Sequence, residues 1–220
     1  MPEYKAVIFD LDGTLLNTLD DLCSALNHTM LKFGFPERTL EETRRFVGNG
    51  VDRLIELATP DGRNNPHFRD VVNEYRTYYA AHSEIKTKPY DGVCELIDKL
   101  QSDGIETAVV SNKMHEATVT LCKKYFPAVK NVCGEREADG IRRKPYPDMV
   151  LSVVKTLGLE LSDCVYVGDS EVDIMTAKNA GMDCISVLWG FRDRDYLAKL
   201  GASRFAADVD GLYALITEKR

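Results

Sequence analysis

Short apolar runs, rich in β-branched and aromatic residues, recur along the chain. The clear runs are residues 5–10, 106–111, 163–168 and 183–188, and a weaker one covers 204–208. Continuous apolar runs of this length are typical of strands that are buried on both faces. Between the later runs the apolar residues follow helical spacing, as in Val93, Leu96, Ile97 and Leu100. This alternation predicts βαβ units and therefore a parallel sheet covered by helices on both sides.

Residues 17–85 have a different pattern, with helix signals and no strand. Their apolar residues keep helical spacing, notably Leu19, Leu22, Leu26 and Met30, then Phe68, Val71, Val72, Tyr75 and Tyr79. Three helix starts are expected, at Thr18 with Asp21, at Thr39 with Glu42 and at Asn65 with Pro66. The sequence therefore predicts an α/β core domain, formed by residues 1–16 and 86–220. A helical domain over residues 17–85 interrupts that core immediately after its first strand.

The composition of the 220-residue chain narrows the possible partners. It carries 28 Lys and Arg against 35 Asp and Glu, a formal net charge of −7, and no basic run. Binding to a nucleic acid draws on clustered Lys and Arg, so we expect no nucleic-acid partner. No apolar run approaches the ~20 residues that span a bilayer, so we expect no membrane association. The six cysteines are scattered without a Cys-x-x-Cys pair, which is typical of a reducing compartment, and we expect a cytoplasmic protein.

Two carboxylates directly follow the first predicted strand, in the segment Phe9-Asp10-Leu11-Asp12-Gly13-Thr14. In open parallel sheets the ligand crevice lies outside the carboxyl ends of the strands. Asp10 and Asp12, at a spacing of two, can both point toward such a crevice, and Gly13 permits close approach of the backbone. A turn with solvated carboxylates is the alternative interpretation of this segment alone.

Further polar residues stand near other predicted strand ends. Ser111 and Asn112 offer a hydroxyl and an amide suited to phosphate oxygens, and Lys144 stands beside Pro145, which we expect to open the next helix. A lysine there can act as a point charge on a phosphoryl group. Asp169 and Asp173, four residues apart, are predicted to face the same side of a helix start. Clustered acids repel unless a divalent cation lies between them, and hard oxygen ligands suit Mg²⁺.

Each of these elements by itself could serve only the structure, as a helix cap or a solvated lysine. Together, in this order, they point to a phosphate-processing site. The set Asp10-x-Asp12-Gly13-Thr14, Ser111, Lys144-Pro145 and Gly168-Asp169-x-x-x-Asp173 resembles the four motifs of the haloacid dehalogenase (HAD) superfamily of phosphotransferases. The resemblance implies a Rossmann-like, doubly wound parallel sheet with an inserted α-helical cap domain.

Within that superfamily, residues 47–51 and the fourth motif are similar to phosphoglycolate phosphatases and their close relatives. One departure is Asn17-Thr18, where these proteins often carry Asp-Ser. It lies at the hinge into the cap, so it bears on closure of the cap or on the choice of substrate.

The resemblance assigns roles to the matching residues. Asp10 is expected to attack phosphorus and form an aspartyl phosphate, and Asp12 to act first as acid and then as base. Mg²⁺ is expected on the Asp10 carboxylate, the Asp12 backbone carbonyl and Asp169, with Asp173 supporting ligands or waters. The phosphoryl oxygens are expected on Ser111, the Asn112 backbone and Lys144. The cap turn Gly48-Asn49-Gly50 is expected to contribute to substrate specificity.

The leading hypothesis is a Mg²⁺-dependent phosphatase of a small phosphate monoester, with 2-phosphoglycolate as the best single guess, acting as a monomer or homodimer. Alternatives within the superfamily are a phosphomutase like β-phosphoglucomutase, a pyrophosphatase and a nucleotidase. A phospho-accepting switch or a non-catalytic binding module is the alternative of another class. Receiver-type switches lack a general acid two residues after the acceptor Asp, and they need only about half this length.

Overall fold

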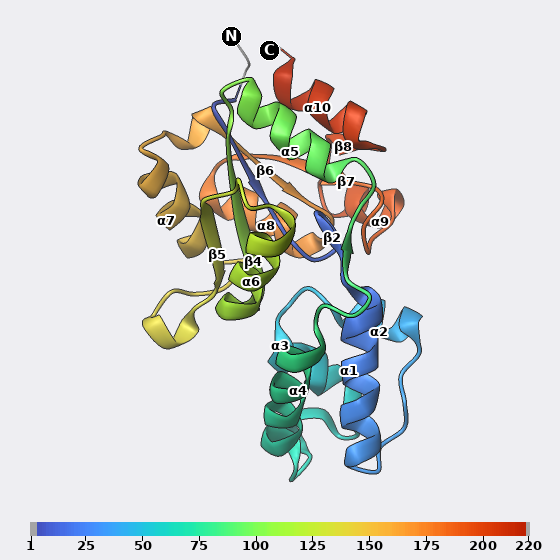
Figure 1. Cartoon of the computed structure of the whole chain (residues 1–220). Coiled ribbons are helices and arrows are strands. Elements are labelled where there is room, and N and C mark those ends of the chain that lie inside the picture. The colour runs from blue at the N-terminus through green and yellow to red at the C-terminus, as the bar shows by residue number, and fades with distance from the viewer. Residues whose placement is uncertain (1–3, 219–220) are drawn as a thin grey trace. The chain divides into compact units, whose positions relative to one another are not determined.

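The computed structural model describes residues 4–218 (Figure 1). The chain divides into two compact units. One ends at Leu16 and resumes at Pro89, and the other covers Asn17–Lys88. The sequence-based boundary after residue 85 falls three residues before the observed division. Lys86 and Thr87 stay with the helical unit because their backbone N–H groups bind Asp21 of that unit.

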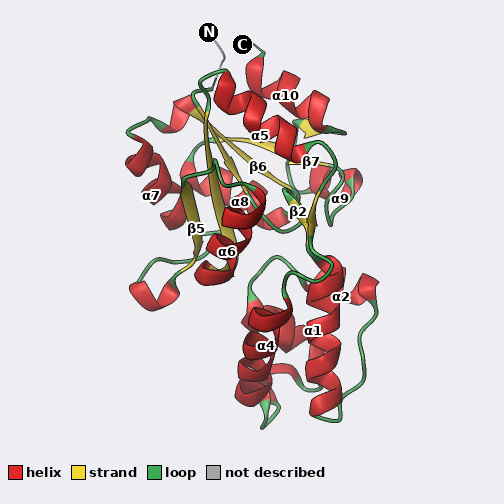
Figure 2. Ribbon diagram, viewed as in Figure 1, coloured by secondary structure: helices red, strands yellow, loops and turns green. Residues whose placement is uncertain are grey.

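The core unit is built on a six-stranded parallel sheet, flanked by helices (Figure 2). Its strands, in spatial order, are β5 (Asn131–Glu135), β4 (Glu106–Met114), β1 (Ala6–Phe9), β6 (Cys164–Gly168), β7 (Asp183–Val187) and β8 (Phe205–Ala206). The expected α/β class with a doubly wound parallel sheet is therefore confirmed. The four clear apolar runs correspond to β1, β4, β6 and β7, and the weaker run to the short β8.

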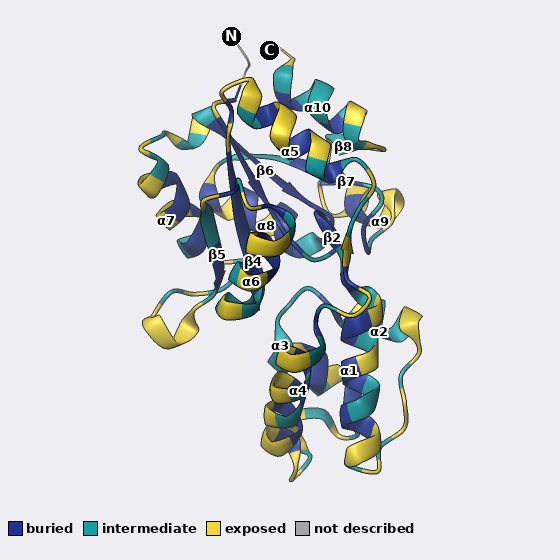
Figure 3. Ribbon diagram, viewed as in Figure 1, coloured by how far each residue is buried: buried dark blue, intermediate teal, exposed yellow. Residues whose placement is uncertain are grey.

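Alternate residues of β1 point to opposite faces of the sheet and pack into two separate hydrophobic layers. Val7 and Phe9 pack in one layer with α5 (Val93–Ser102), α6 (His115–Tyr125) and α10 (Val209–Thr217). Ala6 and Ile8 pack in the other layer with α7 (Asp148–Leu157) and α8 (Glu171–Ala180). All four strand residues are buried, which explains why β1 is a continuous apolar run rather than an alternating one (Figure 3).

The strand order places a topological switch at β1. The chain runs from β1 outward through β4 and β5, and then returns to the other side for β6, β7 and β8. Phe9 is paired with Val109 of β4 and with Val167 of β6, so the carboxyl ends of these three strands meet at one edge. Ligand crevices in open α/β sheets lie at such a point. The remaining core helices are α9 (Arg194–Lys199) and two 3₁₀ turns, Glu137–Asp139 and Leu161–Asp163.

Two features of the sheet were not expected from the pattern. Strand β4 continues to Met114, because after an irregularity beyond Val110 it pairs again with β5. Strand β5 itself carries only two apolar residues in its sequence Asn-Val-Cys-Gly-Glu, so it has no apolar run. A Cβ at Gly134 of β5 would lie 2.5 Å from the Cα of His115, so this strand needs glycine for its close contact with α6.

The helical unit contains α1 (Leu19–Lys32), α2 (Leu40–Phe46), α3 (Val51–Ala58), a 3₁₀ turn at Gly62–Asn64 and α4 (Phe68–His82). The expected apolar face of α4 is buried. The predicted capping box at Thr39 and Glu42 is present. Two short strands, β2 (Leu16–Asn17) and β3 (Lys88–Pro89), pair where the chain passes between the units. Within residues 4–218, no helix combines the length and apolar character that crossing a bilayer requires.

The predicted capping box at Thr18 and Asp21 is wrong. Thr18 makes no side-chain cap hydrogen bond. The buried Asp21 carboxylate instead accepts hydrogen bonds from the backbone N–H of Lys86, at 2.9 and 3.0 Å, and of Thr87, at 2.8 Å. A carboxylate at this position satisfies backbone donors 65 residues away, which no local pattern could reveal. Asp21 therefore ties the first helix of the unit to its last segment.

We expect Asp21→Ala to lower the free energy of unfolding by about 2–3 kcal/mol, because backbone donors lose a charged acceptor. The control is Asp20→Ala, since Asp20 is the exposed neighbour in the same helical turn, and a change within about 0.5 kcal/mol is expected there. Urea unfolding followed by circular dichroism measures both variants. Equal stability of the two variants would show that the Asp21 bridge contributes nothing.

Candidate active site

Asp10 leaves the carboxyl end of β1 and lies at the centre of the candidate site. Its backbone N–H donates to the carbonyl of Val167 at 2.8 Å, which continues the pairing of β1 with β6 for one more residue. The Asp10 carboxylate is nearly buried, with a residue exposure of 8%. Its Oδ1 accepts from the Leu11 backbone N–H at 2.7 Å. The carboxylate is thus fixed in orientation by the loop that it begins.

Lys144 supplies the counter-charge from a different part of the chain. Its ammonium lies 2.9 Å from Oδ1 of Asp10, 2.7 Å from Oδ1 of Asp173 and 3.0 Å from the hydroxyl of Tyr166. Burial opposes the charge, but the two carboxylates hold the pKa of Lys144 well above its usual value. The segment that carries Lys144 differs from the prediction, because Pro145 does not open a helix. The helix begins at Asp148 with Pro147 as its cap residue.

Asp173 acts as a support within this site. Its Oδ2 accepts from the backbone N–H of Asp169 at 3.2 Å, and from the N–H and hydroxyl of Ser170 at 3.0 and 2.7 Å. Asp173 therefore caps the start of α8 and holds Lys144 with its other oxygen. The sequence predicted that Asp169 and Asp173 would lie together, and they do. Ser170 rather than Asp169 is the N-cap residue.

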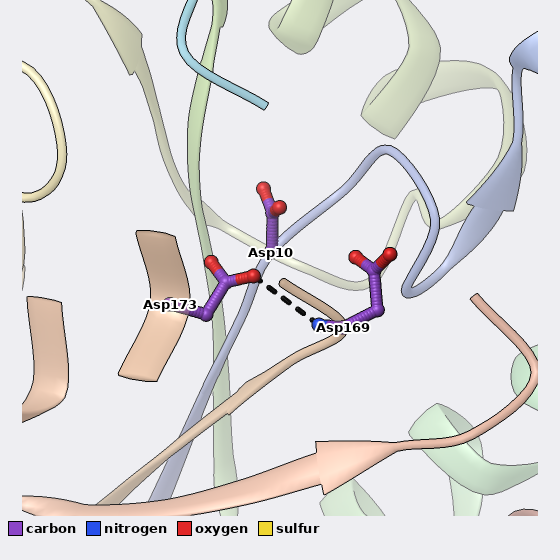
Figure 4. A group of neighbouring side chains, drawn as sticks. All are labelled: Asp10, Asp169 and Asp173. Carbon is purple, nitrogen blue, oxygen red and sulfur yellow. Dashed lines mark hydrogen bonds between the residues drawn. The ribbon is translucent and has the colours of Figure 1, made fainter. Parts of the chain in front are cut away.

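Asp169 lies on the loop between β6 and α8, where its carboxylate accepts two hydrogen bonds. Thr14 donates its hydroxyl to Oδ1 at 3.1 Å, and Phe191 donates its backbone N–H to Oδ2 at 2.7 Å. Figure 4 shows that the carboxylates of Asp10 and Asp169 point in a common direction, while Asp173 reaches the backbone of Asp169.

The three carboxylates of Asp10, Asp169 and Asp173 form the acidic cluster of the site. Each offers an oxygen, and these oxygens all lie within 4.8 Å of one another. Burial raises the pKa of Asp10 to about 7, against the opposing charge of Lys144 and with the help of Asp173. Burial, followed by the charges of Asp173 and Asp10, holds the pKa of Asp169 well above its usual range. When ionised, the three carboxylates would carry more negative charge than Lys144 neutralises, which is why burial without a cation favours their protonated forms.

Glycines surround this cluster where no side chain would fit. A Cβ at Gly13 would lie 2.4 Å from the Asp169 carboxylate, and one at Gly190 would lie 2.3 Å from the Asp169 side chain. At Gly168, a Cβ would lie 2.2 Å from the Asp173 carboxylate. Gly13 also has a φ of +86°, which favours glycine. The glycines thus let backbone approach the acidic cluster on several sides.

Ser111 and Asn112 lie in β4, close to its exit from the sheet, rather than beyond its end. Because Phe9 is opposite Val109, Ser111 lies level with the residues that follow Asp10. Both residues are buried. The Ser111 hydroxyl accepts from the backbone N–H of Lys113 at 3.4 Å. The Asn112 side chain donates to the Lys144 carbonyl at 2.9 Å and so ties β4 to the Lys144 segment.

Lys113 is a site residue that the sequence interpretation missed. Its ammonium lies 3.0 and 3.2 Å from the two carboxylate oxygens of Asp12. The side-chain exposure is 3% for Lys113 and 14% for Asp12. A charged residue directly after Ser111-Asn112, close behind the apolar run of β4, was the available signal. The pattern did not show that its partner would be 101 residues away.

The predicted specificity residues Gly48, Asn49 and Gly50 form the turn between α2 and α3 of the helical unit. Gly48 and Gly50 have φ angles of +124° and +80°, which favour glycine at both positions. The structure thus bears out a turn at this place, and its role in specificity stays a prediction.

Comparison with known proteins gives consistent matches over most of the chain. The family model of the haloacid dehalogenase-like hydrolases matches residues 7–187. A phosphoglycolate phosphatase of Agrobacterium fabrum is 34% identical, over 87% of this chain and 84% of its own length. One from Aquifex aeolicus is 32% identical, over 85% and 86% respectively. A crystal structure of a candidate phosphoglycolate phosphatase from Lactobacillus delbrueckii subsp. bulgaricus is 38% identical, with a TM-score of 0.94 and full coverage of both chains.

The matched region includes β1, β4, β6 and β7 and therefore every strand that carries an acidic or phosphate-binding candidate. The buried carboxylate cluster with its lysine lies at the switch point that this fold provides. By sequence and by structure, the chain belongs to the haloacid dehalogenase-like hydrolases, and it is a phosphoric monoester hydrolase of that superfamily.

Proposed function

We propose that the chain is a Mg²⁺-dependent phosphatase that hydrolyses a small phosphate monoester through an aspartyl phosphate on Asp10, with 2-phosphoglycolate as its best candidate substrate. The observation that carries this proposal is the buried Asp10 carboxylate, held by Lys144 at the switch point of the sheet. Its two close contacts in the described residues, with Lys144 and the Leu11 N–H, both fall on Oδ1. Oδ2 is therefore the atom offered to the substrate.

In the first step, Oδ2 of Asp10 attacks phosphorus, and the bond between phosphorus and the ester oxygen breaks. Asp12, two residues further on the same loop, gives a proton to the departing alkoxide. In the second step, a water attacks the phosphorus of the aspartyl phosphate, and Asp12 takes its proton. The P–O bond to Asp10 breaks, and inorganic phosphate leaves with the carboxylate restored.

Lys144, the Ser111 hydroxyl and the Asn112 backbone are the groups proposed to hold the phosphoryl oxygens. The Lys144 ammonium is oriented by Asp173 and Tyr166 before any substrate arrives. A donor that is fixed in advance stabilises the charge that spreads over the phosphoryl oxygens in the transition state, without the cost of reorganisation.

The residues present fit a divalent cation. The cluster offers only hard carboxylate oxygens, their charge exceeds that of Lys144, and glycines keep side chains away from them. Asp10, Asp169 and the Asp12 backbone carbonyl would hold Mg²⁺, with Asp173 in support because its oxygens already accept four hydrogen bonds. When bound, the cation would offset the repulsion between the Asp10 carboxylate and the anionic substrate.

The candidate substrate rests on the relatives, since those from Agrobacterium fabrum and Aquifex aeolicus are named phosphoglycolate phosphatases. The cap turn Gly48-Asn49-Gly50 is proposed to contribute to the choice of substrate.

With Mg²⁺ present, we expect Asp10→Asn to lower the release of phosphate from an aryl phosphate at least about 1,000-fold, because an amide oxygen is a poor nucleophile. Acid quenching during turnover, followed by mass spectrometry, should find a phosphorylated Asp10 peptide in the wild type alone. The matched control is Asp98→Asn, at an exposed position on α5 of the core unit, and this variant should keep the wild-type rate. Near-normal turnover by the Asp10 variant would exclude the proposed nucleophile.

The stability of the metal-free protein should fall as the pH rises from about 4 to about 7. Over this window the folded state, with Asp10 titrating at about 7, binds more protons than the unfolded state. Asp10→Asn removes the part of this dependence that Asp10 contributes. In EDTA, we expect the variant to exceed the wild type in unfolding free energy by on the order of 2 kcal/mol at pH 7.5 and to match it near pH 4.

Mg²⁺ should offset the loss of stability that the ionised Asp10 causes, so it should raise the melting temperature of the wild type at pH 7.5. The rise should be much smaller for Asp169→Asn, because this variant lacks a proposed ligand of the cation. Thermal unfolding with EDTA or with Mg²⁺ measures both effects. An Asp10 variant that has no advantage in EDTA at pH 7.5 would contradict the assigned charge imbalance.

In a screen of phosphate monoesters with Mg²⁺, we expect kcat/KM to be highest for 2-phosphoglycolate. The comparison should include glucose 1-phosphate, nucleoside monophosphates and pyrophosphate. A tenfold preference for any of these would replace the proposed substrate and leave the phosphatase chemistry in place. Conversion of glucose 1-phosphate into the 6-phosphate would instead identify a phosphomutase.

A further inference from the structure

The ion pair between Lys113 and Asp12 has no part in the mechanism described so far. The Lys113 ammonium meets both oxygens of the Asp12 carboxylate, at 3.0 and 3.2 Å. The Lys113 side chain is only 3% exposed. The pair also lies beside the buried face of α6. Burial, helped by the charge of Asp12 and opposed by that of Lys113, raises the pKa of the Cys122 thiol to about 12.

The backbone at Lys113 is held firmly. The Thr118 hydroxyl of α6 lies 3.3 Å from the Lys113 carbonyl and 2.9 Å from that of Met114. A Cβ at Gly134 of β5 would lie 2.7 Å from the same Lys113 carbonyl, so β5 packs tightly against it. The strand therefore has little freedom to move, and adjustment at this position falls to the lysine side chain.

The proposed reaction requires Asp12 to leave this ion pair. To donate a proton to the leaving oxygen, Asp12 has to be protonated, and a neutral carboxyl group would leave the buried Lys113 ammonium without its counter-ion. Breaking a buried ion pair by removal of one partner is strongly unfavourable. A substrate that brings a second anionic group, besides its phosphoryl group, to Lys113 removes this cost, whereas a substrate without one does not.

We propose that Lys113 is a specificity-determining residue, whose ammonium binds a carboxylate of the substrate in exchange for Asp12. This inference rests on the proposed function and names the substrate class of the same site. The distance is set by Asp12, which lies within 3.2 Å of Lys113 and has to reach the leaving oxygen. A carboxylate on the carbon that bears the ester oxygen, as in a phosphorylated 2-hydroxy acid, fits this short distance.

A matched pair of substrates tests this assignment. 2-Phosphoglycolate and ethyl phosphate share the two-carbon alkyl phosphate, and only the former has a carboxylate in place of the methyl group. For the wild type with Mg²⁺, we expect kcat/KM to favour 2-phosphoglycolate about 30-fold or more. In Lys113→Met this ratio should fall to about 3 or less, because the anchor for the carboxylate is gone. Lys113→Arg keeps the charge and should retain a ratio of at least about 10.

The control is Lys123→Met, since Lys123 is an exposed lysine of α6, and it should keep the wild-type ratio within about twofold. Should Lys113→Met fail to fold, Lys113→Gln removes the same charge and should give the same fall in the ratio. A wild-type ratio that persists in the neutral variants overturns the anchor. An equal loss of kcat/KM on 2-phosphoglycolate and on ethyl phosphate also overturns the anchor, because Lys113 would then act only through Asp12.

The proposed function is tested separately by p-nitrophenyl phosphate, whose good leaving group needs no proton. A wild type that releases phosphate from this ester but shows no preference between the matched pair overturns only the role of Lys113. A wild type that hydrolyses none of the three esters overturns the proposed function as well.

Discussion

A single buried ammonium holds the candidate site together. Lys144 contacts Asp10 at the end of β1, Asp173 at the start of α8 and Tyr166 within β6. These residues are far apart in the chain, and two of them carry negative charge in a place that water hardly reaches. Without the lysine, the ionised carboxylates would repel each other across a low-dielectric space. The Tyr166 hydroxyl extends the link, since it donates to the Val110 carbonyl of β4.

The charged groups of the candidate site neutralise one another only in part. The net charge is −7, yet the site itself is built from four aspartates and two buried lysines. Each lysine is matched to one of the two aspartates of the first loop, Lys144 to Asp10 and Lys113 to Asp12. Asp169 accepts hydrogen bonds from neutral donors, so its carboxylate is left to be neutralised by a proton or by a cation. The proposed chemistry thus follows from an incomplete neutralisation that is confined to one edge of the sheet.

The strands β1, β4, β6 and β7 could be predicted because a strand buried on both faces has to be apolar throughout. Strand β5 could not be predicted, because Gly134 is there for contact with α6 and leaves no apolar run. Similarly, Thr39 and Glu42 form the expected capping box, because that motif is local. Asp21 does not form one, because its carboxylate accepts hydrogen bonds from the backbone of Lys86 and Thr87 at the far end of the helical unit.

By itself, the sequence determined the fold class, the interrupted core and the identity of Asp10, Asp12, Lys144, Asp169 and Asp173 as candidates, because each follows from short-range pattern or motif. Only the tertiary structure decided how these groups are paired. In the folded chain, Asp173 pairs with Lys144 and caps α8. Asp12 pairs with Lys113, a lysine that no motif had singled out. The physical reason is that pairing depends on distances between strand ends in a folded sheet, and burial makes those distances decisive for charge.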